Sequence, residues 1–190
     1  QICRIDYEET FSPEYSRDLM QAARAWLDDY SVFIVSDYDK GCSHHLPDFM
    51  AAAREKGARV LVDPKRPDLS HYAGAFLVKP NWKEFVATAR FERAPGAEKP
   101  ISPKDHDAIR VIADYLMQKH DIAHLVVTMG ADGFVHAARD GYFAAHPTKA
   151  REVFDLSGAG DSFMATLAAQ LCRGADLVHA IELGNAAAGI

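Results

Sequence analysis

The sequence predicts an α/β protein whose mainly parallel sheet has helices on both faces. Apolar runs of strand length, among them residues 32–36 and 59–63, alternate with longer segments of helical periodicity, among them residues 14–29 and 46–56. This alternation is typical of parallel sheets, because a crossover between parallel strands is usually a helix. Two short apolar runs around a Gly-containing turn, within residues 133–147, predict an antiparallel hairpin at one edge.

Local signals place the other boundaries. Gly57 is a helix stop after residues 46–56. Ser102, followed by Pro103, predicts the start of a helix that runs to residue 119. The remaining expected elements are a strand at 75–78, a helix from about Trp82, a strand at 125–128, hairpin strands at 134–137 and 142–145, and helical segments at 162–171 and 180–190.

Composition and charge exclude several classes of protein. With 190 residues, 48% of them hydrophobic, the chain can bury a sizeable core, and one domain over residues 1–190 is the simplest organisation. The net charge is −6, and no run of Lys or Arg indicates a nucleic-acid or membrane partner. No apolar run approaches the ~20 residues of a membrane span. The three Cys residues lie far apart, which favours a reducing, cytoplasmic location over a disulfide framework or a zinc site.

Both ends of the sequence indicate a segment of a longer protein. The sequence begins at Gln1 rather than Met, in a segment that already has strand character. The helical pattern over residues 180–190 stops without a capping residue. We therefore expect the domain to be truncated at both ends.

Residues 155–161 carry the most chemical information, reading Asp-Leu-Ser-Gly-Ala-Gly-Asp before a helical segment. Gly158, Ala159 and Gly160 have almost no side chain, so their N–H groups can approach a phosphate closely, and a helix start adds partial positive charge. Asp161 would then be placed to act as a base. The alternative is an ordinary Gly-rich loop with Asp161 as a favourable first-turn charge.

Four polar residues stand at or just after the ends of expected strands. Ligands gather outside the carboxyl ends of parallel strands, so these residues are expected to converge whatever the family. They are Asp37, Asp63, Asn81 and Thr128.

Residues 155–161 resemble the second signature of the ribokinase (PfkB) family of sugar kinases, which commonly reads Asp-Thr-x-Gly-Ala-Gly-Asp. Leu156 departs from the common Thr, and an apolar residue there is similar to the heptose-phosphate kinase branch of the family. The same branch is suggested by other stretches along nearly the whole chain. They are Arg4-x-Asp6-x-Glu8, Ser36-Asp37-Tyr38-Asp39-Lys40-Gly41, Val62-Asp63-Pro64-Lys65, and Lys79-Pro80-Asn81 with Glu84.

The resemblance implies a ribokinase-like three-layer α/β/α fold and an enzyme that transfers the γ-phosphoryl group of ATP to a sugar, with Mg²⁺. The amides of Gly158, Ala159 and Gly160 would stabilise the transferred group, and Asp161 would take the proton of the attacking hydroxyl. The branch implies that the acceptor is heptose 7-phosphate, phosphorylated at its anomeric hydroxyl for the synthesis of ADP-heptose and lipopolysaccharide.

The resemblance also implies a nucleotide side of the site. Asn81 and Glu84 match the family's Asn-x-x-Glu motif, which helps to place magnesium and phosphate, and Glu84 is the expected metal ligand, directly or through water. Their spacing fits an Asn helix cap equally well. The other residues expected at the nucleotide are Thr128, Gly130, Gly133, Asp155 and Asn185.

The acceptor side depends on cations, because a sugar phosphate needs basic partners. Candidates are Arg4, Lys40, Lys65 and Arg66, which lie in the stretches most like the heptose-phosphate kinases, while Asp37 is expected to bind sugar hydroxyls. Lys65 could alternatively meet the terminal phosphates of the nucleotide. Each cation could also be a solvated surface charge, and Asp37 could cap the next turn.

Two other functions stay open. One is a ribokinase-like kinase for another sugar, such as fructose or ribose. The other is a fragment that binds nucleotide without turnover. In the family a preceding segment supplies the lid sheet, an early Gly-Gly sugar motif and often a dimer contact, and the sequence shows none of these. From the resemblance to the family, a homodimer is nevertheless one expected assembly of the protein.

Overall fold

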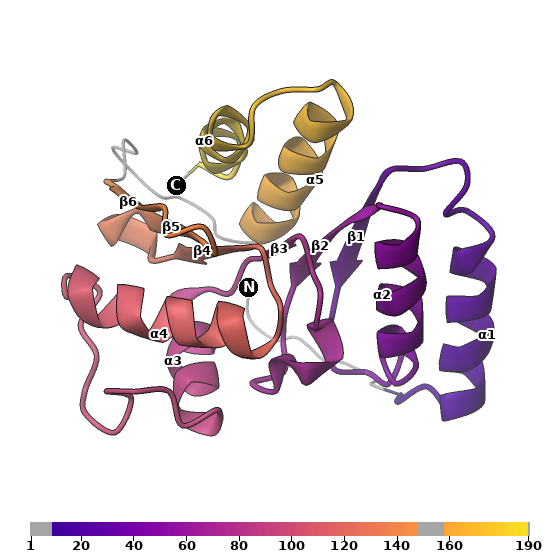
Figure 1. Cartoon of the computed structure of the whole chain (residues 1–190), viewed down its shortest axis with the longest axis horizontal. Coiled ribbons are helices and arrows are strands. Elements are labelled where there is room, and N and C mark those ends of the chain that lie inside the picture. Colours follow the sequence, from indigo (N-terminus) through magenta and orange to yellow (C-terminus); the bar gives the residue numbers. More distant parts are fainter. Residues whose placement is uncertain (1–8, 148–157, 190) are drawn as a thin grey trace, which may run out of the picture.

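A computed structural model describes residues 9–147 and 158–189 of the chain. These residues contain a six-stranded sheet whose strands lie side by side in chain order. The strands are β1 (Val32–Ser36), β2 (Arg59–Asp63), β3 (Leu77–Val78), β4 (His124–Thr128), β5 (Phe134–Ala138) and β6 (Phe143–His146). Figure 1 shows the sheet between two layers of helices.

The sheet is parallel from β1 to β4 and antiparallel from β4 to β6. Val62 of β2 lies beside Val35 of β1 and Val78 of β3, which sets the parallel register. β5 pairs antiparallel with both β4 and β6. Gly141, at φ +96°, lies in the tight turn between β5 and β6. The predicted mainly parallel sheet with an antiparallel edge hairpin is therefore confirmed.

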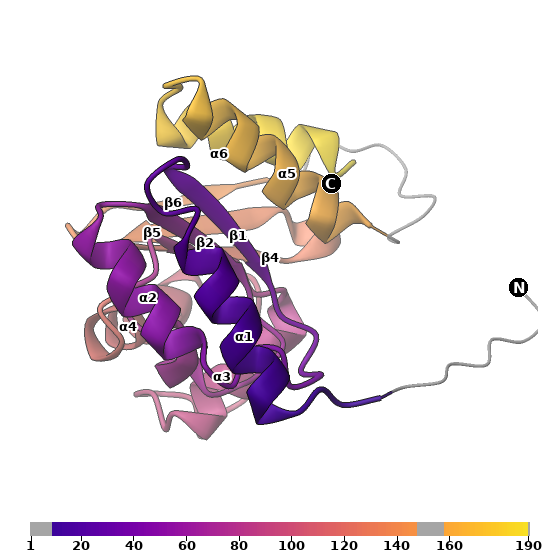
Figure 2. The same cartoon turned by 90° about the vertical axis from the view of Figure 1, so that its right-hand side faces the viewer.

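Helices cover both faces of the sheet (Figures 1 and 2). Because successive parallel strands are neighbours, crossovers of one hand bring their connecting helices to the same face. That face carries α1 (Pro13–Arg24), α2 (Leu46–Glu55), α3 (Trp82–Phe91) and α4 (His106–Lys119), and the other carries α5 (Ala159–Cys172) and α6 (Leu177–Ala187). Within the described residues, no helix is long and apolar enough to cross a membrane.

The core consists of two apolar clusters, one on each face. Along β2, Val60 and Val62 pack with the cluster under α1 to α4, whereas Leu61 packs with the cluster under α5 and α6. This alternation is the two-residue period of a strand buried on both faces. The two clusters fix the strand ends in space, and those ends carry the candidate functional residues.

Several predicted boundaries differ from the structure. α1 ends at Arg24 rather than near residue 29, because residues 25–27 make i→i−3 hydrogen bonds that tighten the chain into turns. α4 begins at His106, where the Asp105 carboxylate accepts from the Ala108 N–H at 3.1 Å, and Ser102 caps only a preceding turn. The predicted strand at 75–78 shortens to Leu77–Val78.

Candidate active site

A cavity of about 450 Å³ opens at the carboxyl ends of β2, β3 and β4, beside the start of α5. Its position is where ligands bind in open α/β sheets. Three of the four strand-end residues expected to converge do line it, whereas Asp37 does not. The lining comprises Asp63, Lys79, Asn81, Trp82, Lys83, Glu84, Thr128, Met129, Gly130, Ala159, Gly160 and Phe163.

The start of α5 carries the predicted anion-binding turn. Gly158, at φ +79°, is the residue before the helix, and Ala159, Gly160 and Asp161 form its first turn. The helix therefore begins earlier than the predicted residue 162. The first amides of a helix lack intrahelical partners, so this end has donors and partial positive charge to offer an anion. Asp161 is exposed on the same turn.

Gly160 permits a close approach between α5 and the strand ends. A Cβ atom at this position would lie 3.1 Å from Oδ2 of Asp63 and 3.5 Å from Nζ of Lys79. The contact with Asp63 is tighter than an ordinary van der Waals contact, so a side chain here would require the helix start or the Asp63 carboxylate to shift by a few tenths of an ångström. The absence of a side chain at Gly160 thus brings the helix start against a charged pair at the end of β2 and β3.

That charged pair is Asp63 and Lys79, whose Oδ1 and Nζ atoms lie 3.0 Å apart. Burial raises the pKa of the Asp63 carboxyl above its ordinary value, the Lys79 ammonium opposes this rise, and the negative charges of Glu84 and Asp161 add to it. Glu84 and Asp161 are therefore within electrostatic reach of Asp63. Asp63 is the carboxylate paired with the buried Lys79 ammonium, and Glu84 and Asp161 add negative charge near that carboxylate.

Asn81 and Glu84 form a capping box at the start of α3. The Asn81 side chain accepts from the Glu84 N–H at 3.0 Å, and the Glu84 carboxylate accepts from the Asn81 N–H at 3.0 Å. The other Glu84 oxygen lies 3.6 Å from Nζ of Lys65. The helix cap is therefore present, and both residues also line the cavity, so the predicted role at magnesium and phosphate stays open beside it.

The acidic residues fit a magnesium ion that is bound mainly through water and phosphate. In the described part of the chain, no three His, Cys, Asp or Glu side chains gather closely enough to hold a metal ion by themselves. Mg²⁺ commonly takes one or two protein carboxylates and fills its octahedron with water and substrate phosphates. Glu84 is suitably placed for that role, because it lines the cavity and its charge acts on Asp63.

The predicted nucleotide turn follows β4 and reaches the same cavity. Thr128 is buried, and its N–H donates to the Pro80 carbonyl at 3.2 Å, which joins this turn to the Asn81 loop. Gly130 begins the short 3-10 helix η2 (Gly130–Asp132). Gly133, at φ +85°, ends that helix and leads into β5. Asn185 is buried within α6.

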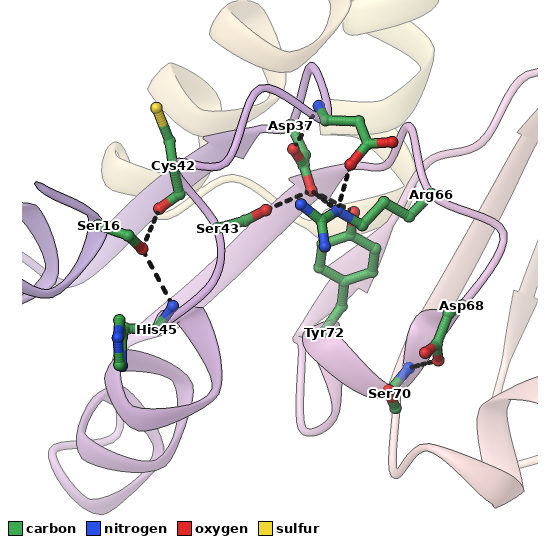
Figure 3. A network of polar contacts seen from close by, with 10 residues as sticks. Ser16, Asp37, Cys42, Ser43, His45, Arg66, Asp68, Ser70 and Tyr72 are labelled. Atoms are coloured by element: carbon green, nitrogen blue, oxygen red, sulfur yellow. Dashed lines mark hydrogen bonds and ion pairs between the residues drawn. The ribbon is translucent and has the colours of Figure 1, made fainter. Parts of the chain in front are cut away.

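Asp37 lies at the centre of an interior polar network (Figure 3). Its Oδ2 accepts from the Tyr72 hydroxyl at 2.6 Å and from the Ser43 hydroxyl at 2.9 Å, and its Oδ1 accepts from the Asp39 N–H at 2.8 Å. Burial, followed by the hydrogen bond that Tyr72 makes to Asp37 and by the Asp37 charge, raises the pKa of the Tyr72 hydroxyl. These hydrogen bonds hold the chain in place at the end of β1. The predicted role of Asp37 in binding sugar hydroxyls stays a prediction.

The proposed acceptor cations separate in space. Arg66 forms ion pairs with Asp37 and Asp39, with its Nε 3.5 Å and 2.9 Å from their carboxylate oxygens. Lys65 instead lies at Glu84, on the nucleotide side. Lys40 lines a separate, mostly apolar cavity of about 620 Å³ between α1, β1 and α2. Arg4 and Asp155 lie outside the described residues.

Lys79 lines the cavity, although the sequence prediction assigns it no individual function. The signal in the sequence is a charged residue directly after an apolar strand, at the predicted ligand edge of the sheet.

Solved structures of sugar kinases share this fold. Phosphofructokinase-2 from Escherichia coli in complex with potassium superposes with a TM-score of 0.74 at 22% identity, over 95% of this chain and 56% of that one. Ribokinase from Arabidopsis thaliana, complexed with ribose and ATP, gives a TM-score of 0.66 at 17% identity, over 96% and 54%. The chain thus shares the fold of these two proteins, which confirms the predicted ribokinase-like fold class.

A family model described as pfkB family carbohydrate kinase matches residues 9–190, so the chain belongs to this family. The bifunctional protein HldE of Shewanella sp. (strain ANA-3) is 38% identical over all 190 residues, and that of Shewanella amazonensis is 39% identical. The chain spans 38% of the length of each of these relatives. These identities confirm the predicted resemblance to the heptose-kinase branch as a similarity of sequence.

Proposed function

We propose that the protein is an ATP-dependent sugar kinase that phosphorylates the anomeric hydroxyl of heptose 7-phosphate, in the synthesis of ADP-heptose. One observation carries the kinase assignment: the Gly158–Asp161 turn begins a helix at a cavity that Asp63, Lys79 and Glu84 also line. The similarity to HldE proteins along the whole chain supports the heptose branch.

The chain's own residues would act mainly by positioning and charge. Phosphoryl transfer passes through a loose transition state with negative charge on the equatorial oxygens, so fixed donors aimed at those oxygens lower the barrier. The amides at Gly158, Ala159 and Gly160 supply such donors at the start of α5. Asp161, one residue further along, accepts the proton of the attacking hydroxyl.

The remaining cavity residues hold the nucleotide. Glu84 with Asn81 would bind Mg²⁺ through water, and the ion, when bound, neutralises charge on the phosphates. Thr128 and Gly130 line the same cavity and would contact the ribose and phosphates. Lys65, 3.6 Å from Glu84, would meet the same phosphates. The proposal includes a cytoplasmic location, whereas pairing of two copies stays a prediction of the resemblance.

The deciding experiment measures ADP release by the protein with Mg²⁺-ATP and heptose 7-phosphate, beside fructose, ribose and their phosphates. Selective turnover of heptose 7-phosphate supports the full proposal. Turnover of another sugar would retain the kinase and overturn the substrate. Absence of turnover with every sugar would favour nucleotide binding without catalysis.

Calorimetry separates that last outcome from an inactive preparation. ATP is titrated alone and then in the presence of each sugar. A competent site binds ATP and responds to the correct acceptor, whereas a nucleotide-only site binds ATP with the same affinity whichever sugar is present.

A further inference from the structure

Asp39 is an exposed carboxylate on the loop after β1 that the proposed mechanism does not use. Its side chain is 58% exposed, whereas that of Asp37, two residues earlier, is 3% exposed. The backbone φ of Asp39 is +55°, which is uncommon for a residue other than glycine, although Asp and Asn tolerate it. The loop therefore turns at Asp39 and leaves its carboxylate open to a ligand.

The Asp37 carboxylate, in contrast, is engaged inside the protein (Figure 3). Its Oδ2 accepts from the hydroxyls of Tyr72 and Ser43, and its Oδ1 accepts from the Asp39 N–H. Nε of Arg66 lies 3.5 Å from the same Oδ2. A sugar hydroxyl would reach Asp37 only by displacing one of these partners, and a displaced buried group costs free energy. The structure thus favours a role for Asp37 in holding the loop.

Two contacts order Asp39 without using all of its carboxylate. Its N–H donates to Asp37 Oδ1 at 2.8 Å, and its own Oδ1 lies 2.9 Å from Nε of Arg66. The Arg66 side chain is only 15% exposed, so this ion pair has one well-anchored partner. A carboxylate has about four acceptor positions on its two oxygens, and the ion pair through Oδ1 leaves some of them over. Asp39 can therefore accept further hydrogen bonds from a position that is already fixed.

The loop that carries Asp39 borders the proposed transfer site. The Asp37 N–H donates to the Asp63 carbonyl at 3.0 Å, and Asp63 lines the candidate active-site cavity. α5, whose first turn carries Asp161, packs against β1 as well as β2. In phosphoryl transfer the attacking and leaving oxygens are roughly in line, so the acceptor lies on the side of the transferred group away from ADP. With the nucleotide at the ends of β2 to β4, the loop after β1 is the next strand end that an acceptor can meet.

From these observations, and resting on the proposed function, we propose that Asp39 is an acceptor-binding residue that helps to determine which sugar is used. Its carboxylate accepts hydrogen bonds from sugar hydroxyls that do not react. Hydroxyl-to-carboxylate bonds are charge-assisted, and a site built for them rejects analogues that lack the hydroxyl. The same negative charge repels a phosphate, so the phosphate end of the acceptor points away from Asp39.

A purely structural Asp39 is the competing account. Its carboxylate would then serve only as the turn residue's side chain and as a partner of Arg66. An exposed ion pair of this kind contributes little to stability, so its loss would change neither the fold nor the acceptor KM. The two accounts therefore differ in the acceptor KM once the carboxylate is removed.

The test measures steady-state kinetics with Mg²⁺-ATP and heptose 7-phosphate, or with whichever sugar of the panel above the protein turns over. The variants are Asp39→Gly and Asp39→Asn, because both residues accept a positive φ and so leave the backbone of the loop unchanged. The matched control is Asp28→Asn, which removes another exposed carboxylate that is paired with a cation, here Lys56. Thermal unfolding checks that each protein is folded.

An acceptor-binding Asp39 predicts that Asp39→Gly raises the acceptor KM by about tenfold or more, with the ATP KM within about twofold of wild type. Asp39→Asn should raise the acceptor KM less, since its amide oxygen still accepts hydrogen bonds, and Asp28→Asn should resemble wild type. An unchanged acceptor KM in Asp39→Gly, or an equal rise in both KM values, would overturn the inference and leave the kinase proposal intact. A wild-type protein that turns over no sugar would overturn the proposed function, and this inference with it.

Discussion

Asp161 is the residue on which the proposed chemistry depends most directly. It lies in the first turn of α5, exposed, and its charge acts on the Asp63 carboxylate. A base at this point can accept the proton of a hydroxyl that attacks a phosphate bound at the helix start. A favourable first-turn charge would look the same in the structure, so the two roles are separated by kinetics.

We expect Asp161→Asn to lower kcat by at least about a hundredfold, because a general base typically contributes 10²- to 10⁴-fold. ATP affinity should change by less than about threefold, since Asn keeps the size of the side chain. The matched control is Asp107→Asn, which removes the first-turn carboxylate of α4. Steady-state kinetics and calorimetry check both expectations, and a near-normal kcat in Asp161→Asn would remove Asp161 from the role.

His136 is a buried titratable residue away from the cavity. Its Nε2 lies 3.3 Å from Nδ1 of His124 on the neighbouring strand. Burial, followed by the charges of His124 and His146, lowers the pKa of His136 from 6.5 to about 4. Burial also lowers the pKa of His124. Between these two pKa values of His136, the folded protein therefore keeps this residue neutral where the unfolded chain would be protonated.

This sets the sign of a pH dependence. Between pH 6.5 and about 4 the unfolded chain binds a proton at His136 that the folded protein does not, so the free energy of unfolding falls as the pH falls. The loss from His136 alone should be on the order of 3 kcal/mol across this window. Urea unfolding at pH 7 and pH 4.5 measures it. His136→Gln should flatten the dependence, whereas the exposed control His44→Gln should not; equal slopes in all three proteins would contradict the assignment.

At the scale of single elements, the proposed site depends most on the start of α5. The helix is apolar along most of its length and packs through Phe163, Met164 and Leu167 into the core on its face of the sheet. That packing aims its first turn at the ends of β2 and β3. Gly160 then determines how closely the turn approaches Asp63 and Lys79.

We expect Gly160→Ala to weaken ATP binding by about tenfold while leaving the fold intact. The added methyl would lie 3.1 Å from Asp63 Oδ2, which requires the helix start or the ion pair to shift by a few tenths of an ångström. Alanine favours a helix more than glycine does, by up to about 1 kcal/mol, and this gain opposes the cost of the close contact. The melting temperature should therefore change little. Calorimetry with ATP and a thermal melt measure the two effects. Unchanged ATP affinity would show that the close approach is not needed for binding.

At the scale of the whole molecule, the site joins both sides of the sheet. α3, which carries Glu84, lies on one face, and α5, which carries Asp161, lies on the other (Figure 1). The strand ends between them supply Asp63, Lys79 and Thr128. A nucleotide bound in the cavity as proposed would contact both helical layers at once, and its binding energy should stabilise the complete fold.

ATP should accordingly raise the melting temperature. At about one hundred times its Kd, a ligand specific for the folded state adds about 2.7 kcal/mol to the free energy of unfolding. For a chain of this size that corresponds to roughly 5 to 10 °C. Differential scanning fluorimetry with ATP and Mg²⁺ measures the shift, with inorganic sulfate as the control for general ionic effects. A shift no larger than that given by sulfate would argue against a nucleotide site.

Local sequence patterns were sufficient for much of this structure. The strands at 32–36 and 59–63, the hairpin and the capping spacing of Asn81 with Glu84 were all predicted, because each depends on residues within a few positions of one another. The start of α4 was misplaced from Asp105 to Ser102 since both residues are good caps. Choosing between them depends on which turn packs against the core.

The sequence by itself determined the fold class, the small-residue turn at the start of α5 and the family, because periodicity and a seven-residue motif are local properties of the chain. Only the tertiary structure decided that Lys79 pairs with Asp63 beneath Gly160, and that the Asp37 carboxylate lies inside a network with Tyr72 and Ser43. Those contacts join residues far apart in sequence. They depend on strand register and helix packing, which fix side-chain positions to within an ångström, whereas a sequence pattern fixes only the edge of the sheet at which they occur.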